Sequence, residues 1–226
     1  MKVIFWDFDG TLVYSNPLWS NSVYNALKSV DGNTTVTFSE IRKLMASGFT
    51  WHMPNENYTE FTNEKWWQYM NHYFYSCYLS LNTPQNIAEQ ATAKIRDIIK
   101  KKENYTLYSD AVSTLKKLKS KGIKNVILSN NYPDLCDVLK ELEIYDLFDD
   151  FVISAAVGYD KPRKEIFEIA ENFYPNADEY YMVGDSVNAD IVGGNCAGFK
   201  TILVHKGFCE KADYCFDDLK SIVDLF

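Results

Sequence analysis

The sequence lacks long hydrophobic runs, paired cysteine motifs and a surplus of basic residues. No apolar stretch approaches the roughly 20 residues of a membrane helix, and the run from Val3 to Trp6 is too short for a signal peptide. The five cysteines are scattered without a C-x-x-C pair, which argues against a zinc site and fits reduced thiols. The net charge of −8 argues against a protein with a basic surface that binds nucleic acid. We therefore expect a cytoplasmic protein that binds neither nucleic acid nor a membrane.

Short, continuously apolar runs recur along the 226 residues and predict the strands of a buried sheet. Strands that are apolar on both faces are typical of parallel sheets covered by helices on each side. The spacers between the last four runs have helical periodicity, so we expect right-handed βαβ crossovers and an α/β fold with a doubly wound, mostly parallel sheet. The runs are residues 3–6, 125–128, 151–153, 180–183 and 201–204.

The stretch between the first two runs contains no convincing strand and has helical spacing instead. Thr83 and Pro84 predict an N-cap and a first helical position. We expect a helical domain over 15–105, inserted into an α/β core formed by 1–14 and 106–226. Ten aromatics fall within residues 51–78, and most of them are expected to fill the interior of this small domain.

Polar residues follow the apolar runs at the points where the strands should end. In an open α/β sheet, ligands bind beyond the carboxyl ends of the strands, so these residues should converge. Clustered carboxylates repel one another, and Mg²⁺, a cation that prefers oxygen ligands and works with phosphate, would resolve the repulsion. The residues are Asp7, Asp9, Gly10 and Thr11 after the first run, Ser129 and Asn130 after the second, Lys161 after the third, and Asp185 with Asp190 after the fourth.

Each of these pieces also has a simpler interpretation. The D-x-D-G segment fits an ordinary turn, Ser129 a strand-end hydroxyl, Lys161 a solvated loop charge, and Asp185 the N-cap of a helix. The four pieces together, in order and each at a strand end, are much harder to obtain by chance. With a cation in place, Lys161 and Ser129 would hold an anion, Asp7 would act as a nucleophile and Asp9 as a proton donor.

These four motifs resemble those of the haloacid dehalogenase superfamily, in its phosphatase type with an inserted helical cap. The motifs are Asp7-Phe8-Asp9-Gly10-Thr11-Leu12, Ser129, Lys161-Pro162, and Gly184-Asp185-Ser186 with Asp190. The resemblance implies a Rossmann-like core and an aspartyl-phosphate formed on Asp7, with Asp9 as the acid and then the base. It implies Mg²⁺ bound by the Asp7 carboxylate, the Asp9 backbone carbonyl and Asp185. Phosphate contacts would come from Ser129, Lys161, Asn130 and the amides near Gly10, supported by Asp190.

The resemblance leaves the substrate open, and we expect a small phosphorylated metabolite. Dehalogenases of this superfamily lack the second aspartate of the first motif, so Asp9 favours phosphate chemistry. A sugar phosphomutase would carry a histidine near Trp19, whereas a pyrimidine nucleotidase remains an alternative. A catalytically silent binding protein is the alternative from another class.

The connection over 47–54 is marked by glycine and proline and predicts a cap loop that faces the site, with Trp51 and His52 as candidate substrate contacts.

Overall fold

The computed structural model describes residues 1–53 and 56–226 and contains a six-stranded parallel sheet. The strand order is β3-β2-β1-β4-β5-β6, so β1 lies in the middle between β2 and β4. This confirms the expected doubly wound α/β fold. The strands are β1 (Lys2–Trp6), β2 (Lys124–Ser129), β3 (Asp150–Ile153), β4 (Glu179–Gly184), β5 (Lys200–Val204) and β6 (Tyr214–Phe216).

Both faces of the sheet are buried, as the uninterrupted apolar runs predict. Along β1, Val3 and Phe5 enter the hydrophobic cluster beneath α8 (Lys164–Asn172), while Ile4 and Trp6 enter the cluster on the opposite face. This alternation follows from the period of two in a strand. Helices α5 (Ala111–Ser120) and α6 (Leu135–Glu141) cover that opposite face.

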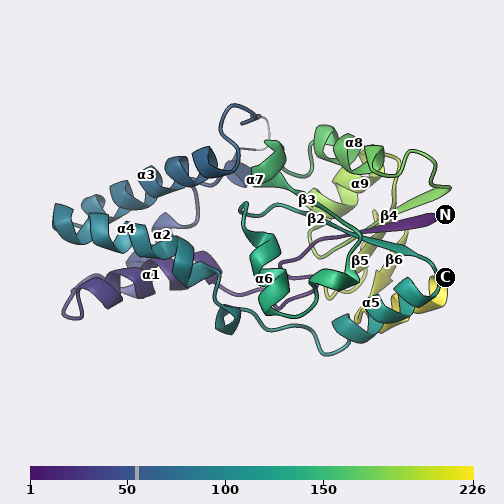
Figure 1. Ribbon diagram of the computed structural model, residues 1–226, viewed down its shortest axis with the longest axis horizontal. Helices are drawn as coiled ribbons and strands as arrows, with labels where there is room; N and C mark the ends of the chain where they lie inside the picture. Colours follow the sequence, from purple (N-terminus) through teal and green to yellow (C-terminus); the bar gives the residue numbers. More distant parts are fainter. Residues whose placement is uncertain (54–55) are drawn as a thin grey trace.

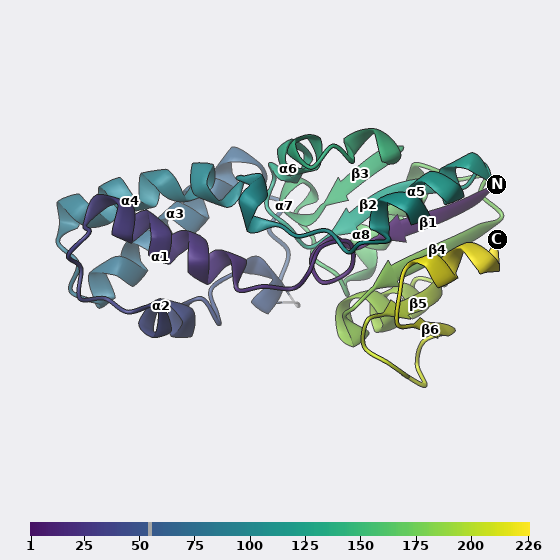
Figure 2. The same cartoon turned by 90° about the horizontal axis from the view of Figure 1, so that it is seen from below.

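Among the described residues, five α-helices lie between β1 and β2; four of them form an extension at one end of the molecule, whereas α5 covers the sheet (Figures 1 and 2). The four are α1 (Leu18–Val30), α2 (Phe38–Leu44), α3 (Glu64–Ser80) and α4 (Gln85–Ile99), with α4 packed against both α1 and α3. This cap follows the first strand as expected, whereas the domain boundaries at residues 15 and 105 stay a prediction. The remaining short elements are η1 (Thr50–His52), η2 (Lys102–Asn104), η3 (Tyr145–Leu147), α7 (Ser154–Val157), η4 (Val187–Val192, a π-helix), α9 (Gly193–Cys196) and η5 (Lys220–Leu225).

Large aromatic side chains fill the cap interior where it meets the core. Trp66, Trp67 and Phe74 are at most 1% exposed, and the half-buried Trp19 ring lies 4.8–6.2 Å from six aromatic rings around it. One of the six, Tyr132, belongs to the loop after β2, so the aromatic cluster bridges the two parts. Burial of such rings supplies the apolar area that a small helical unit needs.

The cap is fastened to the core by polar contacts as well. Asp134, at the start of α6, accepts two hydrogen bonds of 2.9 Å from Arg96 of α4 and one of 2.7 Å from the Trp67 indole of α3. Arg96 also forms a two-pronged pair with Glu64. We call this set of four residues the clasp.

Two connecting segments join the cap to the core side by side. Tyr14 N donates to Thr106 O at 2.8 Å and Tyr108 N donates to Leu12 O at 3.0 Å, so the two segments pair as a short antiparallel ladder. On the far side of the cap, the amides of Tyr58 and Asn63 donate to carbonyls of the segment that contains α7. None of the helices in the described part of the chain has the length and apolar character needed to cross a bilayer.

Two details differ from the sequence-based expectation. The helix after Thr83 begins at Gln85 with Pro84 as its N-cap residue, and the buried Thr83 hydroxyl has no partner within the described residues. The N-cap assignment to Thr83 was therefore wrong by one residue, because the extended Pro84 backbone precedes the helix rather than opening it. Strand β6 was not predicted, since it is only three residues long and half-buried at the sheet edge.

Candidate active site

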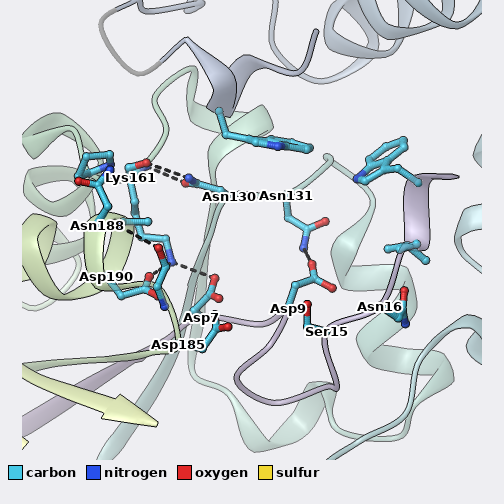
Figure 3. A pocket seen from close by; sticks show the side chains of 16 residues that line it. Asp7, Asp9, Ser15, Asn16, Asn130, Asn131, Lys161, Asp185, Asn188 and Asp190 are labelled. Atoms are coloured by element: carbon cyan, nitrogen blue, oxygen red, sulfur yellow. Dashed lines mark hydrogen bonds and ion pairs between the residues drawn. The ribbon is translucent and has the colours of Figure 1, made fainter. Parts of the chain in front are cut away.

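The polar residues at the carboxyl ends of the strands come together above the middle of the sheet (Figure 3). Asp7 directly follows β1, Ser129 ends β2, and Asp185 directly follows β4. Because β2 and β4 both pair with β1, the ends of these three strands are neighbours in space. The topology therefore explains why Asp7 and Asp185, far apart in the sequence, line one cavity. Ser129 contacts Asp7 but is not among the described lining residues.

Asp7 is held mainly through one of its two carboxylate oxygens. Its Oδ1 accepts a hydrogen bond from Ser129 Oγ at 3.0 Å and another from Lys161 Nζ at 2.9 Å. Its Oδ2 has the Thr11 hydroxyl at 3.5 Å, which is a weak contact. Two donors therefore orient the carboxylate through Oδ1, whereas Oδ2 has only the weak contact with Thr11.

Lys161 is a buried cation between two carboxylates. Its ammonium also donates to Asp190 and to the carbonyl oxygen of Leu128, both at 2.7 Å. Burial alone would lower the pKa of Lys161, but the charges of Asp190 and Asp7 outweigh it and raise the pKa. The lysine therefore stays positively charged and can attract an anion beside Asp7.

Asn130 fixes the backbone that carries this lysine. Its amide donates to Lys161 O at 2.9 Å and accepts from Lys161 N at 2.7 Å. Asn130 lines the cavity, yet its side-chain amide is already used in this exchange. The structure therefore gives Asn130 a positioning role for Lys161, and direct contact with phosphate stays a prediction.

Asp9 lies beside Asp7 on the cap side of the cavity and is held by Asn131. The Asn131 amide donates to Asp9 Oδ2 at 2.7 Å (Figure 3). Burial raises the pKa of Asp9 to about 7, the charge of Asp7 adds to the rise, and the Asn131 donor opposes it. A carboxyl group with this pKa can both give and take a proton near neutral pH.

Asn131 was missing from the sequence-based site. The signal was nevertheless available, because Asn131 follows the same strand end as Ser129 and Asn130. Ser15, Asn16 and Asn188 line the cavity without having been singled out either. They lie on loops or on the π-helix. No local sequence pattern specifies where these segments lie relative to the strand ends.

Three carboxylates form a group suited to a cation. Asp7, Asp185 and Asp190 each offer an oxygen, and these atoms lie within 4.8 Å of one another. Asp190, however, is occupied by Lys161 at one oxygen and by the Ser186 amide at 2.9 Å at the other. Asp7 and Asp185 are therefore the carboxylates best placed to bind a metal ion.

The environment of Asp185 shows an excess of negative charge. Burial raises the pKa of Asp185, and the nearby charge of Asp7 raises it further. Lys206 compensates in part with an ion pair of 3.1 Å.

The loop after β1 approaches Asp185 closely. A Cβ on Gly10, whose φ is 82°, would lie 2.5 Å from the Asp185 side chain, so only glycine fits there. These oxygen donors fit Mg²⁺, while the role of the Asp9 carbonyl stays a prediction.

The cavity above these residues has a volume of about 420 Å³ and reaches the cap. Trp51 lines it, stacked on Phe49 with ring centroids 4.6 Å apart. His52 is not among the described residues that line it; its Nδ1 accepts from the Phe49 amide at 3.4 Å. Trp19 lines the cavity too, at the position where a phosphomutase was expected to carry histidine.

Comparison with known proteins gives a family and a set of enzymatic relatives. The family model of haloacid dehalogenase-like hydrolases matches residues 1–198. A glyceraldehyde 3-phosphate phosphatase of Methanothermobacter thermautotrophicus is 36% identical over 105 residues, which is 46% of each chain. A phosphoserine phosphatase of Thermus thermophilus is 29% identical over 139 residues, covering 61% of this chain and 54% of the relative. Across the first three curated relatives, the match spans about half of their length.

A solved structure shares the whole fold. The HAD-hydrolase YfnB of Bacillus subtilis, which was determined bound to magnesium, superposes with a TM-score of 0.75. The alignment covers 99% of this chain and 97% of the other at 20% identity. The cap and core arrangement is therefore one that occurs in experimentally determined structures.

Proposed function

Because this chain belongs to the haloacid dehalogenase-like hydrolases, we propose that it is a magnesium-dependent phosphomonoesterase that acts on a small phosphorylated metabolite. The observation that carries this proposal is a pair of neighbouring carboxyl groups in different environments. Asp7 is oriented by Ser129 and Lys161, whereas Asp9 has its pKa raised to about 7, chiefly by burial. Such a pair separates the nucleophile from the acid and base.

In the first step, Asp7 attacks the phosphorus atom of the ester and the bond to the leaving oxygen breaks. Lys161 and Ser129 stabilise the negative charge of the phosphoryl group during the transfer. Asp9 gives its proton to the leaving oxygen, so that the alcohol departs neutral. Asp7 then carries the phosphoryl group as an aspartyl-phosphate.

In the second step, Asp9 is ionised and takes a proton from a water molecule that attacks the phosphorus. The bond between phosphorus and Asp7 breaks, which restores the free carboxylate and releases phosphate. Asn131 keeps Asp9 facing the cavity through both steps. Asp190 keeps Lys161 beside Asp7.

A magnesium ion held by Asp7 and Asp185 would supply positive charge that offsets the phosphate and the clustered carboxylates. The donor set supports this part of the proposal, because Asp7 and Asp185 offer hard oxygen atoms close together. The magnesium in the B. subtilis structure supports it independently. A sugar phosphomutase is less favoured, since Trp19 stands where a histidine was expected.

The test is phosphate release from a generic aryl phosphate, measured with Mg²⁺ and after chelation. We expect turnover that requires the metal. A screen across sugar phosphates, nucleotides and phospho-amino acids would then identify the metabolite. If the metal-loaded protein released no phosphate from any member of the panel, the chain would be a silent binding protein instead.

A further inference from the structure

The charges that line the cavity are strongly unbalanced. Among residues 1–53 and 56–226, four aspartates line it against a single cationic side chain, Lys161. Residues 54–55 are proline and asparagine, which carry no charge. A divalent cation would reduce the negative charge of this set without reversing it, and the phosphoryl group then adds its own negative charge. No positive charge is left over for a second anionic group on the substrate.

The part of the cavity that faces Asp9 has a different character. Figure 3 shows Ser15 and Asn16 on the side of Asp9, away from Lys161 and Asp190. The leaving group must lie near Asp9, because this residue protonates it. The lining on the cap side combines two indole rings and one aliphatic side chain with one hydroxyl and one amide group, all of them neutral: Ser15, Asn16, Leu18, Trp19 and Trp51.

We propose that this enzyme selects phosphate esters whose leaving group is an uncharged, hydroxyl-bearing carbon skeleton, and that it rejects esters with a second anionic group. The inference rests on the proposed phosphatase function. Amide and hydroxyl groups would bind the hydroxyls of such a skeleton, and the indole rings would cover its apolar face. A carboxylate in the same place would have no cationic partner and would lose solvation without compensation.

Lys206 is a further cation near the acidic residues of the site. Its ammonium pairs with Asp185 at 3.1 Å, and its side chain is half exposed. It is not among the described lining residues, so its charge is directed to the acidic group rather than to the side of Asp9. It therefore offers no built binding site for a carboxylate on the leaving group.

The discriminating substrates are glyceraldehyde 3-phosphate and 3-phosphoglycerate, which share a three-carbon skeleton but differ by an aldehyde and a carboxylate. We expect kcat/KM for the aldehyde to exceed that for the carboxylate by roughly tenfold to a hundredfold, the effect of one uncompensated like charge. Measurements at two ionic strengths should show the preference shrinking as salt rises.

A matched pair of variants tests the cause of the preference. Asn16→Lys adds a cation on the side of Asp9, whereas Asn16→Gln keeps a neutral amide; both alter the hydrogen bond from Asn16 to Asn104 O. We expect Asn16→Lys to reduce the preference by roughly tenfold and Asn16→Gln to retain it. If either variant fails to fold, judged by thermal unfolding, Ser15→Lys and Ser15→Asn replace them.

The outcomes separate the two proposals. Turnover of an aryl phosphate with equal or better use of 3-phosphoglycerate would overturn the selectivity and leave the phosphatase function intact. An unchanged preference in a folded Asn16→Lys protein would also overturn the electrostatic explanation. Absence of turnover with every ester would overturn the phosphatase function and the selectivity with it.

Discussion

The Asp7 carboxylate is buried close to the carboxylates of Asp185 and Asp190. In the proposed mechanism it is also the group that attacks phosphorus. Asp7→Asn keeps the size of the side chain but removes the carboxylate that we propose as the nucleophile. We expect phosphatase activity to fall by at least about a thousandfold, measured as phosphate release at saturating Mg²⁺. The same change at the exposed Asp97 of the cap should have no effect. Near-normal turnover by Asp7→Asn would remove Asp7 from the mechanism.

Asn131 offers a second prediction at the scale of single residues. Asn131→Asp is isosteric and keeps the oxygen that accepts from the Tyr132 amide, but it places an oxygen against Asp9 where the amide donor was. We expect kcat to fall roughly tenfold to a hundredfold with little change in KM. A variant that altered KM alone would show that Asn131 contacts the substrate instead of positioning Asp9.

At the scale of elements, the clasp decides how firmly the helices of the cap hold the core. Arg96→Lys keeps the charge but loses the planar group that bonds Asp134 and Glu64 at once. We expect the free energy of unfolding to fall by about 1–2 kcal/mol. Urea unfolding measures this loss, and Arg42→Lys, at an exposed position of α2, is the control. Equal loss in both variants would mean that the clasp adds nothing specific.

The clasp should also depend on pH. Burial would raise the pKa of Asp134, but hydrogen bonds and charge from Arg96 outweigh it and lower the pKa. A carboxyl group whose pKa is lower in the folded state stabilises the fold above its unfolded pKa of about 3.9. This stabilisation is lost as pH falls through the folded value. The stability difference between wild type and Arg96→Lys should therefore be constant near neutrality and shrink below about pH 4; a difference that grew on acidification would contradict this.

The elements also differ in how far the sequence predicts them. The strands β1 to β5 were predictable because each is a continuous apolar run buried on both faces. The edge strand β6 was not, because three half-buried residues carry too little periodicity. The sequence predicted that Asp7, Ser129, Lys161 and Asp185 lie close together, because each was expected to follow a strand and parallel strands end at the same edge of a sheet. The structure brings these four residues together. Trp51 and His52 were both predicted as substrate contacts, and Trp51 lines the cavity whereas His52 is not among the described lining residues. This difference depends on how the cap loop packs against Phe49, a tertiary property that no local pattern specifies.

At the scale of the whole molecule, the excess of carboxylates predicts that a bound metal ion raises the stability of the fold. We expect Mg²⁺ at about a hundred times its dissociation constant to raise the midpoint of thermal unfolding by roughly 5–10 °C. Asp185→Asn should lose this shift while melting no lower than wild type without metal, since it removes repulsion with Asp7. Asp178→Asn should keep the shift, because Asp178 immediately precedes β4, at the end of the strand away from the site. A shift that persisted in Asp185→Asn would place the metal elsewhere.

The aromatic cluster around Trp19 gives the protein an optical reporter of its own. Four of its five tryptophans lie in this cluster, with neighbouring indole centroids 5.2–6.3 Å apart. Rings this close couple electronically, and two of them line the cavity. Near-ultraviolet circular dichroism and intrinsic fluorescence should therefore respond to ligand entry and to any separation of cap from core. Ligand binding can thus be followed in the unlabelled protein, through light absorbed by indole rings that line the cavity itself.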